Sequence, residues 1–489
     1  MRLTPVFFAA ASAALGFYFL FRVPHAVIIV IFSLSLIVLC FFRVLSSLNS
    51  QSKKLQLTAV YSFVIAIGLC AGVSAASAGQ AEIKFGITEN DIIAIEGILK
   101  EDPRIISGRN AMVTLSLKKS ASKGGLRVSS SGEILVFFPE LNAETIKQFG
   151  RGADVYAEGK LRSNDRGTYF NAVSLHVVKP APSIERMRTN IRLSLISRFE
   201  KKTGSVQTRN NWNGLALALL LGIRDNLDSE FTEMFRNAGL SYILSLSGMH
   251  LAIITALIAF LLKKPLGLKI SAGLSALIII LYCFLVGPTP SLIRAMLMYL
   301  LGVITIIFAL PKKAMSVLAL SFLLQIVITP HAGNSLSFIL SYLALLGILV
   351  IAKAISSIFA GKIPEFILQP VSVSCGAFLA TAGICSLTFG TLAPIGIIAG
   401  LLIVPLTTVF MIGSIIWLFL DLFAVSGFFS YPMSWLYNLM ESIALIAGKT
   451  PGLNLKPGIV IVLSLAISIF VIVFNYFQQK RLLHIDTFN

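Results

Sequence analysis

The sequence predicts a polytopic α-helical membrane protein, with about 12 transmembrane helices, that carries one small β-barrel domain outside the cytoplasm. Three observations predict this fold class. The 489 residues are 56% hydrophobic and only 13% charged, with a mean hydropathy of +0.86, which excludes an ordinary soluble globular protein. Apolar stretches of about 20 residues, the length needed to cross a bilayer, recur along the chain. Between residues 81 and 180 the pattern changes to short alternating stretches separated by turns.

Residues 1–80 are predicted as amino-terminal transmembrane helices. They contain three candidate spans, at residues 5–21, 27–42 and 55–76. The first span runs almost directly into the second, without the polar exit of a cleavable signal, so we expect a retained helix.

Residues 81–180 are predicted as the β-barrel domain. Five stretches alternate as strands do, bounded by Gly, Ser and Asn-Asp turns. They are residues 92–99, 113–117, 134–138, 155–161 and 169–178. Five short strands in about 100 residues are typical of an OB-like barrel. We expect residues 142–150 to form the helix that such a barrel usually carries between its third and fourth strands.

Residues 181–238 are predicted as a basic amphipathic helix and connecting helices. Residues 180–212 carry seven Lys or Arg against two Glu, and their apolar residues recur at helical spacing. Two interpretations stay open: the helix lies on anionic lipid headgroups, or it forms a basic collar for a nucleic acid. The arginines concerned are Arg186, Arg188, Arg192 and Arg198.

Residues 239–489 are predicted as a transmembrane bundle of nine further spans. The spans are 240–262, 270–287, 290–310, 314–329, 335–352, 366–388, 392–420, 430–448 and 458–477. The stretch 392–420 is long enough for one tilted helix, a broken helix, or a helix plus a re-entrant piece.

Lysine and arginine set the expected orientation, because cytoplasmic loops are enriched in both. With the amino terminus inside, five cationic clusters face the cytoplasm, and only the loop with Lys449 and Lys456 disagrees. This orientation places the barrel, the basic helix and the loops at 287–291 and 329–334 outside.

The charge distribution favours a pathway for an anion. The net charge is +18, and after Met234 only four acidic residues face 13 cationic ones. Transporters coupled to protons or cations usually bury carboxylates within the membrane, so a cation pump is disfavoured.

The densest polar motif of the bundle lies between Phe235 and His250. Its small and hydroxyl-bearing residues permit close helix packing and can line a polar path. Ser247 and His250, at i and i+3, also have the spacing of a nucleophile and base, but no third orienting group is evident. The residues assigned to the path are Arg236, Asn237, Ser245, Ser247, Gly248 and His250.

Arg294 completes the predicted path. Pro288 and Pro290 break the helix just before it, which frees backbone amides that, with the guanidinium, can receive a phosphate-like group. The alternative is that Arg294 reaches the outer interface from one turn inside the span.

No cofactor or metal is expected. The five cysteines all lie in apolar stretches without Cys-x-x-Cys spacing, and the five histidines are scattered.

Five ordered motifs resemble the competence domain of ComEC-type DNA-uptake channels. They are Leu221–Asp225, Phe235–Ser241, Leu246–His250, Pro290–Met298 and Ser335–Ser341. The amino-terminal spans and the OB-like domain resemble the same family. The resemblance implies a multi-pass channel of the bacterial cytoplasmic (inner) membrane that conducts single-stranded DNA inward during natural transformation.

The same resemblance implies partners. Single-stranded DNA would meet the barrel and basic helix outside, through its backbone charge and by stacking on Tyr156, Tyr169 or Phe170. The alternative for these three aromatics is ordinary packing in the barrel core. An extracytoplasmic DNA receptor, a separate nuclease and a cytoplasmic motor or single-strand-binding protein are expected, along with membrane lipid. The alternatives are a relative that transports another polyanion or a lipid-linked anion, and an intramembrane enzyme using Ser247 and His250.

Departures from the family pattern also shape the expectation. Many members carry a metallo-β-lactamase-like domain with a His-x-His-x-Asp-His cluster, which is absent from this sequence, so no enzymatic activity is expected. Gly383 and Gly400 stand where the family tends to have Pro and Asn, which weakens the assignment of residues 392–405 to a pore lining.

Overall fold

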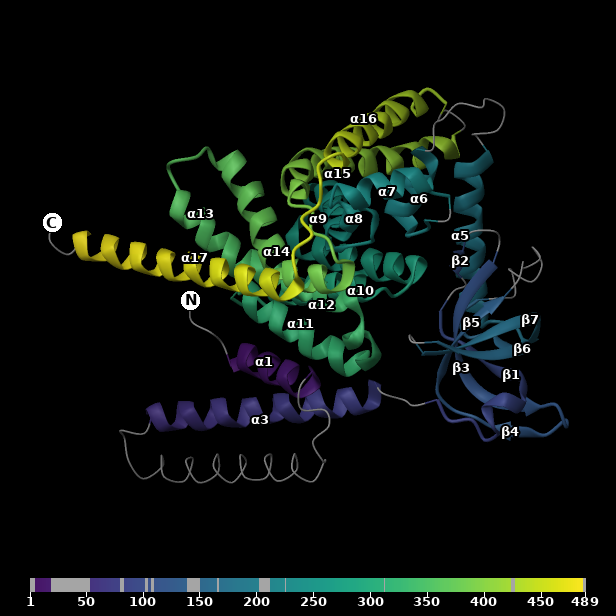
Figure 1. Ribbon diagram of the computed structural model, residues 1–489. Coiled ribbons are helices and arrows are strands. Elements are labelled where there is room, and N and C mark those ends of the chain that lie inside the picture. The colour runs from purple at the N-terminus through teal and green to yellow at the C-terminus, as the bar shows by residue number, and fades with distance from the viewer. Residues whose placement is uncertain are drawn as a thin grey trace.

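The computed structural model describes residues 5–18, 53–79, 83–101, 104–106, 110–138, 150–164, 167–201, 212–224, 226–311, 313–423 and 427–486. A closed barrel lies beside one end of the helical part, and the carboxyl-terminal helix reaches away on the opposite side (Figure 1). The predicted span at 27–42, and the predicted helix at 142–150 except Gly150, lie outside the described residues.

Five strands close the barrel, each pairing with its neighbours in the order β1-β6-β7-β5-β3 and back to β1. All pairs are antiparallel except β5 with β7, which is parallel. The strands are β1 (Ile92–Leu99), β3 (Asn110–Ser122), β5 (Glu133–Phe138), β6 (Asp154–Asn164) and β7 (Gly167–Lys179). These coincide with the five predicted strands and confirm the OB-like barrel. Two short strands, β2 (Arg104–Ile106) and β4 (Arg127–Ser129), also pair with β3.

The barrel core follows from alternation along the strands. Val113 and Leu115 on β3, Val136 on β5 and Phe170 on β7 point inward and are fully or almost fully buried. Gly159 marks a bulge in β6, where a Cβ would collide with the carbonyl oxygen of Asn171. A side chain cannot fit there, so the close approach of β6 and β7 requires glycine.

The amino-terminal helices α1 (Pro5–Tyr18) and α3 (Lys53–Gly79) pack closely through small residues. A Cβ on Gly72 would collide with the carbonyl oxygen of Ala13, which shows how near the two backbones lie. The Tyr18 hydroxyl donates a hydrogen bond to the carbonyl of Gly333 (2.7 Å). This bond ties the amino-terminal pair to the 3-10 turn Pro330–Asn334 in the bundle.

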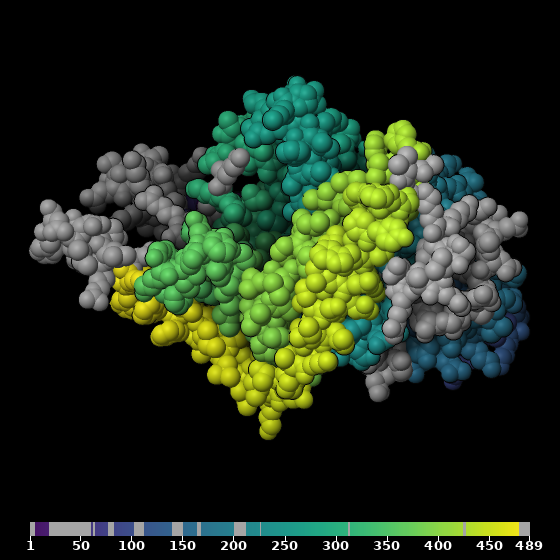
Figure 2. All heavy atoms as spheres, turned by 90° about the horizontal axis from the view of Figure 1, so that it is seen from above, coloured from purple at the N-terminus to yellow at the C-terminus, as the bar shows by residue number. Residues whose placement is uncertain are grey.

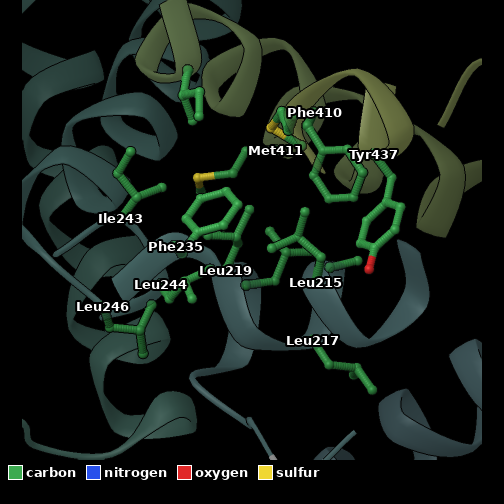
Figure 3. Packing of buried hydrophobic residues seen from close by; sticks show 14 of the residues in the cluster. Leu215, Leu217, Leu219, Phe235, Ile243, Leu244, Leu246, Phe410, Met411 and Tyr437 are labelled. Atoms are coloured by element: carbon green, nitrogen blue, oxygen red, sulfur yellow. The ribbon is translucent and has the colours of Figure 1, made fainter. Parts of the chain in front are cut away.

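Four helices connect the barrel to the bundle. They are α5 (Ser183–Lys201), α6 (Trp212–Leu221), α7 (Ser229–Asn237) and α8 (Ser241–Leu244). In α6 nearly every side chain is buried, and Leu215, Leu217 and Leu219 pack in the cluster that Figure 3 shows with Phe410 and Tyr437. The part of the bundle formed by α7, α9, α15 and α16 therefore packs on α6, a short apolar helix that the sequence patterns did not single out.

The bundle proper consists of the remaining helices. They are α9 (Gly248–Val286), α10 (Pro290–Ile307), α11 (Ala314–Ile328), α12 (Leu336–Gly347), α13 (Lys353–Phe359), α14 (Glu365–Phe389), α15 (Ile395–Leu422), α16 (Ser430–Gly448) and α17 (Pro457–Asp486). A π-helical stretch, Ile348–Ala352, joins α12 to α13. The nine predicted spans after residue 239 all fall on these helices and α8.

Within the described ranges, six helices are long and apolar enough to cross a membrane. They support an integral membrane protein with a barrel domain, and the count of about 12 spans stays a prediction. Figure 2 shows these helices forming a broad body with the barrel in blue at one side and α17 in yellow at another. The stretch 392–420, left open above, forms one helix, α15, with Pro405 inside it.

Two predicted spans are joined differently from the expectation. The chain from Leu240 does not enter a span directly, because α8 ends at Leu244 and α9 begins only at Gly248. Helix α9 then covers two predicted spans and turns back at Gly267, where φ is 74°. Its two ends, Gly248 and Val286, therefore lie on the same side of the bundle, and Lys263 and Lys264 lie at the far corner.

The barrel contacts the bundle on the side where α11 ends and α12 begins. The Nε2 of His331, in the 3-10 turn, lies 3.6 Å from a carboxylate oxygen of Glu133 on β5. Lys100, on the barrel beside Glu133, pairs with the same carboxylate. The barrel is thus joined to the helical part at this turn as well as through α5.

We expect the substitution Phe170→Ala to destabilise the barrel by about 3–5 kcal/mol, because it leaves a cavity at a fully buried position. Protease cleavage within residues 83–179 of the intact chain, followed against denaturant, measures this loss. The matched control is Val173→Ala on the same strand, whose side chain is 77% exposed and whose loss should stay within about 0.5 kcal/mol. Equal effects of the two substitutions would contradict the assigned core.

Candidate functional site

The beginning of α9 is a capped break in the helical path. Ser245 and Ser247 have extended backbones, and the Ser247 hydroxyl oxygen accepts a hydrogen bond from the backbone N–H of Met249 (3.3 Å). The Nδ1 of His250 accepts one from the backbone N–H of Ser247 (3.2 Å). Together these bonds form a capping box, which satisfies the backbone amides that a helix start leaves free.

The capping box accounts for the i, i+3 spacing of Ser247 and His250. Their side chains also approach each other, with 3.0 Å between Oγ and Nδ1. Because Nδ1 accepts from a backbone amide, the ring proton of the neutral imidazole is on Nε2. That Nε2 is fully buried.

The start of α10 lies against the same break. The Ser291 hydroxyl donates to the carbonyl of Leu246 (2.8 Å), which fixes the first turn of α10 beside the start of α9. The side-chain amide of Gln325 on α11 donates to the carbonyl of Pro290 (2.8 Å), and the hydroxyl of Tyr342 on α12 donates to the amide oxygen of Gln325 (2.9 Å). One chain of hydrogen bonds therefore ties α9, α10, α11 and α12 together.

Arg294, one turn into α10, is buried at the centre of this network, with only 6% of the side chain exposed. Its guanidinium lies 5.9 Å from the ring centroid of Tyr342, a cation–π contact. On its other side is Gly248, where a Cβ would stand 3.1 Å from a terminal guanidinium nitrogen. Glycine at position 248 thus lets the guanidinium reach the amino terminus of α9.

The charge of Arg294 is not balanced within the described residues. No carboxylate among the described residues pairs with it, and its Nε has no hydrogen-bond partner there. The amino terminus of α9 adds a partial positive charge of about half an elementary unit beside this cation. Two positive centres thus lie side by side, an arrangement that an anion would stabilise.

The structure brings together Ser247, Gly248, His250 and Arg294, with Ser245 in the preceding extended segment. It places the two other predicted path residues elsewhere. Arg236 and Asn237 are exposed at the end of α7, which packs on α16, and Arg236 pairs with Glu233 (2.9 Å).

Sequence reasoning missed the supporting side chains Gln325 and Tyr342. A usable signal was present, because a glutamine within an apolar span is costly unless its amide is paired. Gln325 is completely buried, and its amide is paired at both ends.

The four arginines predicted on the basic helix do not share one environment. Arg188 is only 2% exposed, pairs with Glu185 (3.0 Å), and donates to the carbonyl of Phe284 on α9 (3.4 Å). It therefore presents no surface to DNA or lipid and instead holds α5 on the bundle. Arg186 is exposed, Arg192 is half-buried, and Arg198 pairs with Asp421 on α15 (3.5 Å).

The three barrel aromatics proposed for base stacking also differ. Phe170 is completely buried in the core, which removes it as a candidate. Tyr156 lies under the guanidinium of Arg127, at 5.6 Å. Tyr169 is half-buried on the outer face and packs edge-on against Phe137 of β5, with Arg162 opposite it on β6.

A closed barrel joined to an acid-poor apolar bundle, with a buried arginine where two helices begin, defines a class of integral membrane protein. A model of the competence protein family matches residues 219–481, more than half of the chain. The chain belongs to this family.

Two curated relatives extend the comparison. An uncharacterised protein of Aquifex aeolicus (strain VF5) is 28% identical over 55% of this chain and 64% of its own length. ComE operon protein 3 of Bacillus subtilis (strain 168) is 26% identical over 71% of this chain and 46% of its own length. The chain thus spans less than two thirds of either relative.

We expect Ser247→Ala to lower the stability by about 1 kcal/mol, because it removes the helix cap. The thermal unfolding midpoint of the detergent-solubilised chain checks this, with Ser245→Ala as the control outside the cap. A serine-directed activity probe should label the wild type and Ser247→Ala equally. Labelling that disappears with Ser247 would contradict the capping role and favour a nucleophile.

We expect Arg188→Gln to destabilise the protein by about 3 kcal/mol, since it leaves the mostly buried carboxylate of Glu185 without its partner. The control, Arg186→Gln, changes an exposed side chain on the same helix and should stay within about 0.5 kcal/mol. Equilibrium unfolding in detergent micelles compares the two. A stable Arg188→Gln variant would show that α5 is held by other contacts.

Proposed function

We propose that this chain conducts single-stranded DNA across the bacterial cytoplasmic membrane during natural transformation. The observation that carries the proposal is the buried guanidinium of Arg294, which faces the start of α9 without a carboxylate partner in the described residues. Membership of the competence protein family supports DNA as the anion.

A phosphodiester fits the chemistry of this site. It carries one negative charge and two free oxygens, which the guanidinium can receive side by side. The partial positive charge at the amino terminus of α9 adds to this attraction. No carboxylate among the described residues is a fixed counter-ion of Arg294. Each phosphate of a moving strand can therefore pair with the guanidinium in turn and be replaced by the next phosphate.

The barrel supports an approach route on its outer face. Tyr169 offers an aromatic ring beside Phe137, and Arg162 and Lys160 lie across from β7 on β6. Stacking of a base on an aromatic ring contributes about 1–3 kcal/mol and tolerates any sequence. A single strand is therefore suited to this face, whereas a duplex has no unstacked bases to offer.

The orientation belongs to the proposal as well. Short segments and hydrogen bonds connect three features: the barrel contact at His331, the starts of α9 and α10, and the contact of Arg188 with Phe284. We therefore propose that all three lie on the same side of the membrane as the barrel. Lys263 and Lys264 lie at the far corner of α9, as expected for a cytoplasmic loop. We place the barrel outside and keep the division into residues 1–80, 81–180, 181–238 and 239–489 as part of the proposal.

Partners complete the proposed mechanism. The sequence has no Gly-x-x-x-x-Gly-Lys-Ser/Thr motif, so a cytoplasmic motor or single-strand-binding protein must pull or trap the strand. An outer DNA receptor and a separate nuclease acting on the other strand are proposed from membership of the competence protein family.

We expect Arg294→Gln to reduce DNA entry at least about tenfold, because a buried charged partner of the phosphate is lost. The assay uses proteoliposomes that contain single-strand-binding protein inside and receive labelled oligothymidine and a nuclease outside. Protected label measures entry. Arg294→Lys should recover only part of it, since lysine lacks the planar fork, and Arg236→Gln on α7 should leave entry unchanged.

A second variant tests the site without changing charge. Gly248→Ala inserts a methyl group against the guanidinium and should also slow entry, whereas Gly273→Ala, on the same helix with open space around it, should not. Entry that survives both Arg294→Gln and Gly248→Ala would remove the site from the pathway. Wild-type vesicles that protect no DNA but accumulate inorganic polyphosphate would favour transport of another polyanion.

A further inference from the structure

We propose that a groove between α5 and the end of α15 binds one anionic phospholipid. The groove has a volume of about 840 Å³ and runs along one face of α5, from Ser183 to Arg198. Leu418 and Leu422, in the last turns of α15, form its opposite wall. This site is separate from Arg294 and does not depend on the proposed channel function.

The groove is held open by contacts on the other faces of α5. The buried Arg188 fixes the helix to Phe284 of α9, and Phe199 stacks on Trp417 of α15 with ring centroids 4.7 Å apart. Figure 1 shows α5 standing between the barrel and the end of α15. A ligand would therefore enter a preformed site and would not have to order the helix.

The walls of the groove suit a lipid chain. Met187 and Ile191 line it one helical turn apart and are 56% and 43% exposed, so they form an apolar patch that a ligand can cover. Leu422 is 60% exposed and ends a helix that is apolar enough to span a membrane. The apolar stripe of α5 thus continues onto the exposed apolar end of α15, and acyl chains are the covering that we propose for both.

The charges of the groove call for an anionic headgroup. Arg198 is already paired with Asp421, whose side chain is almost completely buried, so that pair is neutral as it stands. Arg186 lies about 18 Å away along the helix and is exposed. Its guanidinium donates to the hydroxyl of Ser183 (3.4 Å), and no carboxylate of the described residues pairs with it. A lipid with its phosphate beside Arg186 and its acyl chains on Leu418 and Leu422 would neutralise this cation and cover the apolar wall of the groove.

Lipid is favoured over DNA by the balance of the lining. Between Arg186 and Arg198 the groove is lined by apolar side chains with two uncharged polar ones, Asn190 and Ser194, and it has no further cation there. A nucleic-acid backbone would need a cation at each phosphate. Basic helices that carry an exposed apolar stripe, as α5 does with Met187 and Ile191, commonly bind anionic headgroups.

The test measures lipid binding to the full chain by native mass spectrometry in detergent. Dioleoyl phosphatidylglycerol should bind in preference to dioleoyl phosphatidylcholine. Arg186→Gln should weaken phosphatidylglycerol binding about fivefold, the contribution expected of one cation near anionic lipid, and should leave phosphatidylcholine binding unchanged. Arg236→Gln, an exposed arginine on α7, is the matched control and should alter neither.

A second variant examines the apolar wall. Leu422→Asp places a charge at an exposed position and should weaken phosphatidylglycerol binding without unfolding the chain. Wild-type affinity of Arg186→Gln for phosphatidylglycerol, or equal binding of the two lipids, would overturn the proposal. Loss of labelled oligothymidine binding in Arg186→Gln, with lipid binding intact, would also overturn it and assign the groove to DNA.

Discussion

Two helices begin side by side at one end of the bundle, and the backbone groups of their first turns must be satisfied without relying on water. This constraint explains the polar residues between α9 and α12. Ser247 and His250 cap α9, Ser291 ties α10 to the break, and Gln325 with Tyr342 extends the network to α11 and α12. The network orients Arg294 through Tyr342 and Gly248, yet within the described residues it does not neutralise the charge.

The basic character of the chain divides into different physical roles. Arg188 is a packing residue that anchors α5, and Arg198 compensates a buried aspartate on α15. Arg186 and Arg294 differ from both, because no carboxylate among the described residues pairs with them. The number of positive charges on the basic helix is therefore larger than the number of arginines that a ligand can reach. Burial and ion pairing distinguish the arginines that a ligand can reach from those that hold the fold together.

Much of the fold was predictable because its signals are local. Strand alternation located β1, β3, β5, β6 and β7, and apolar length located the helices of the bundle. Other elements escaped for physical reasons. Strands β2 and β4 have only three residues each, too few for alternation to register, and α6 is apolar on all sides, so it has no periodic face.

The site was only partly predictable, since several patterns fit more than one structure. An i, i+3 pair of Ser and His suits a nucleophile with its base and equally suits a capping box, and the hydrogen bonds to the backbone distinguish them. Sequence spacing also could not show that Arg188 turns inward while Arg186, two residues earlier, turns outward. Arg236 and Asn237 precede the polar break by few residues, yet α7 carries them to another surface.

The attachment of the barrel has a consequence for the strength of binding. The barrel is fastened through Arg188 on α5 and through Glu133 at His331, so its position relative to the start of α10 is restrained. In the proposed function, a strand held on the barrel is offered to Arg294 at an effective concentration of about millimolar, as for sites joined by a short tether. Each contact can then be weak and short-lived, which lets the strand advance, while the pair together keeps it from diffusing away.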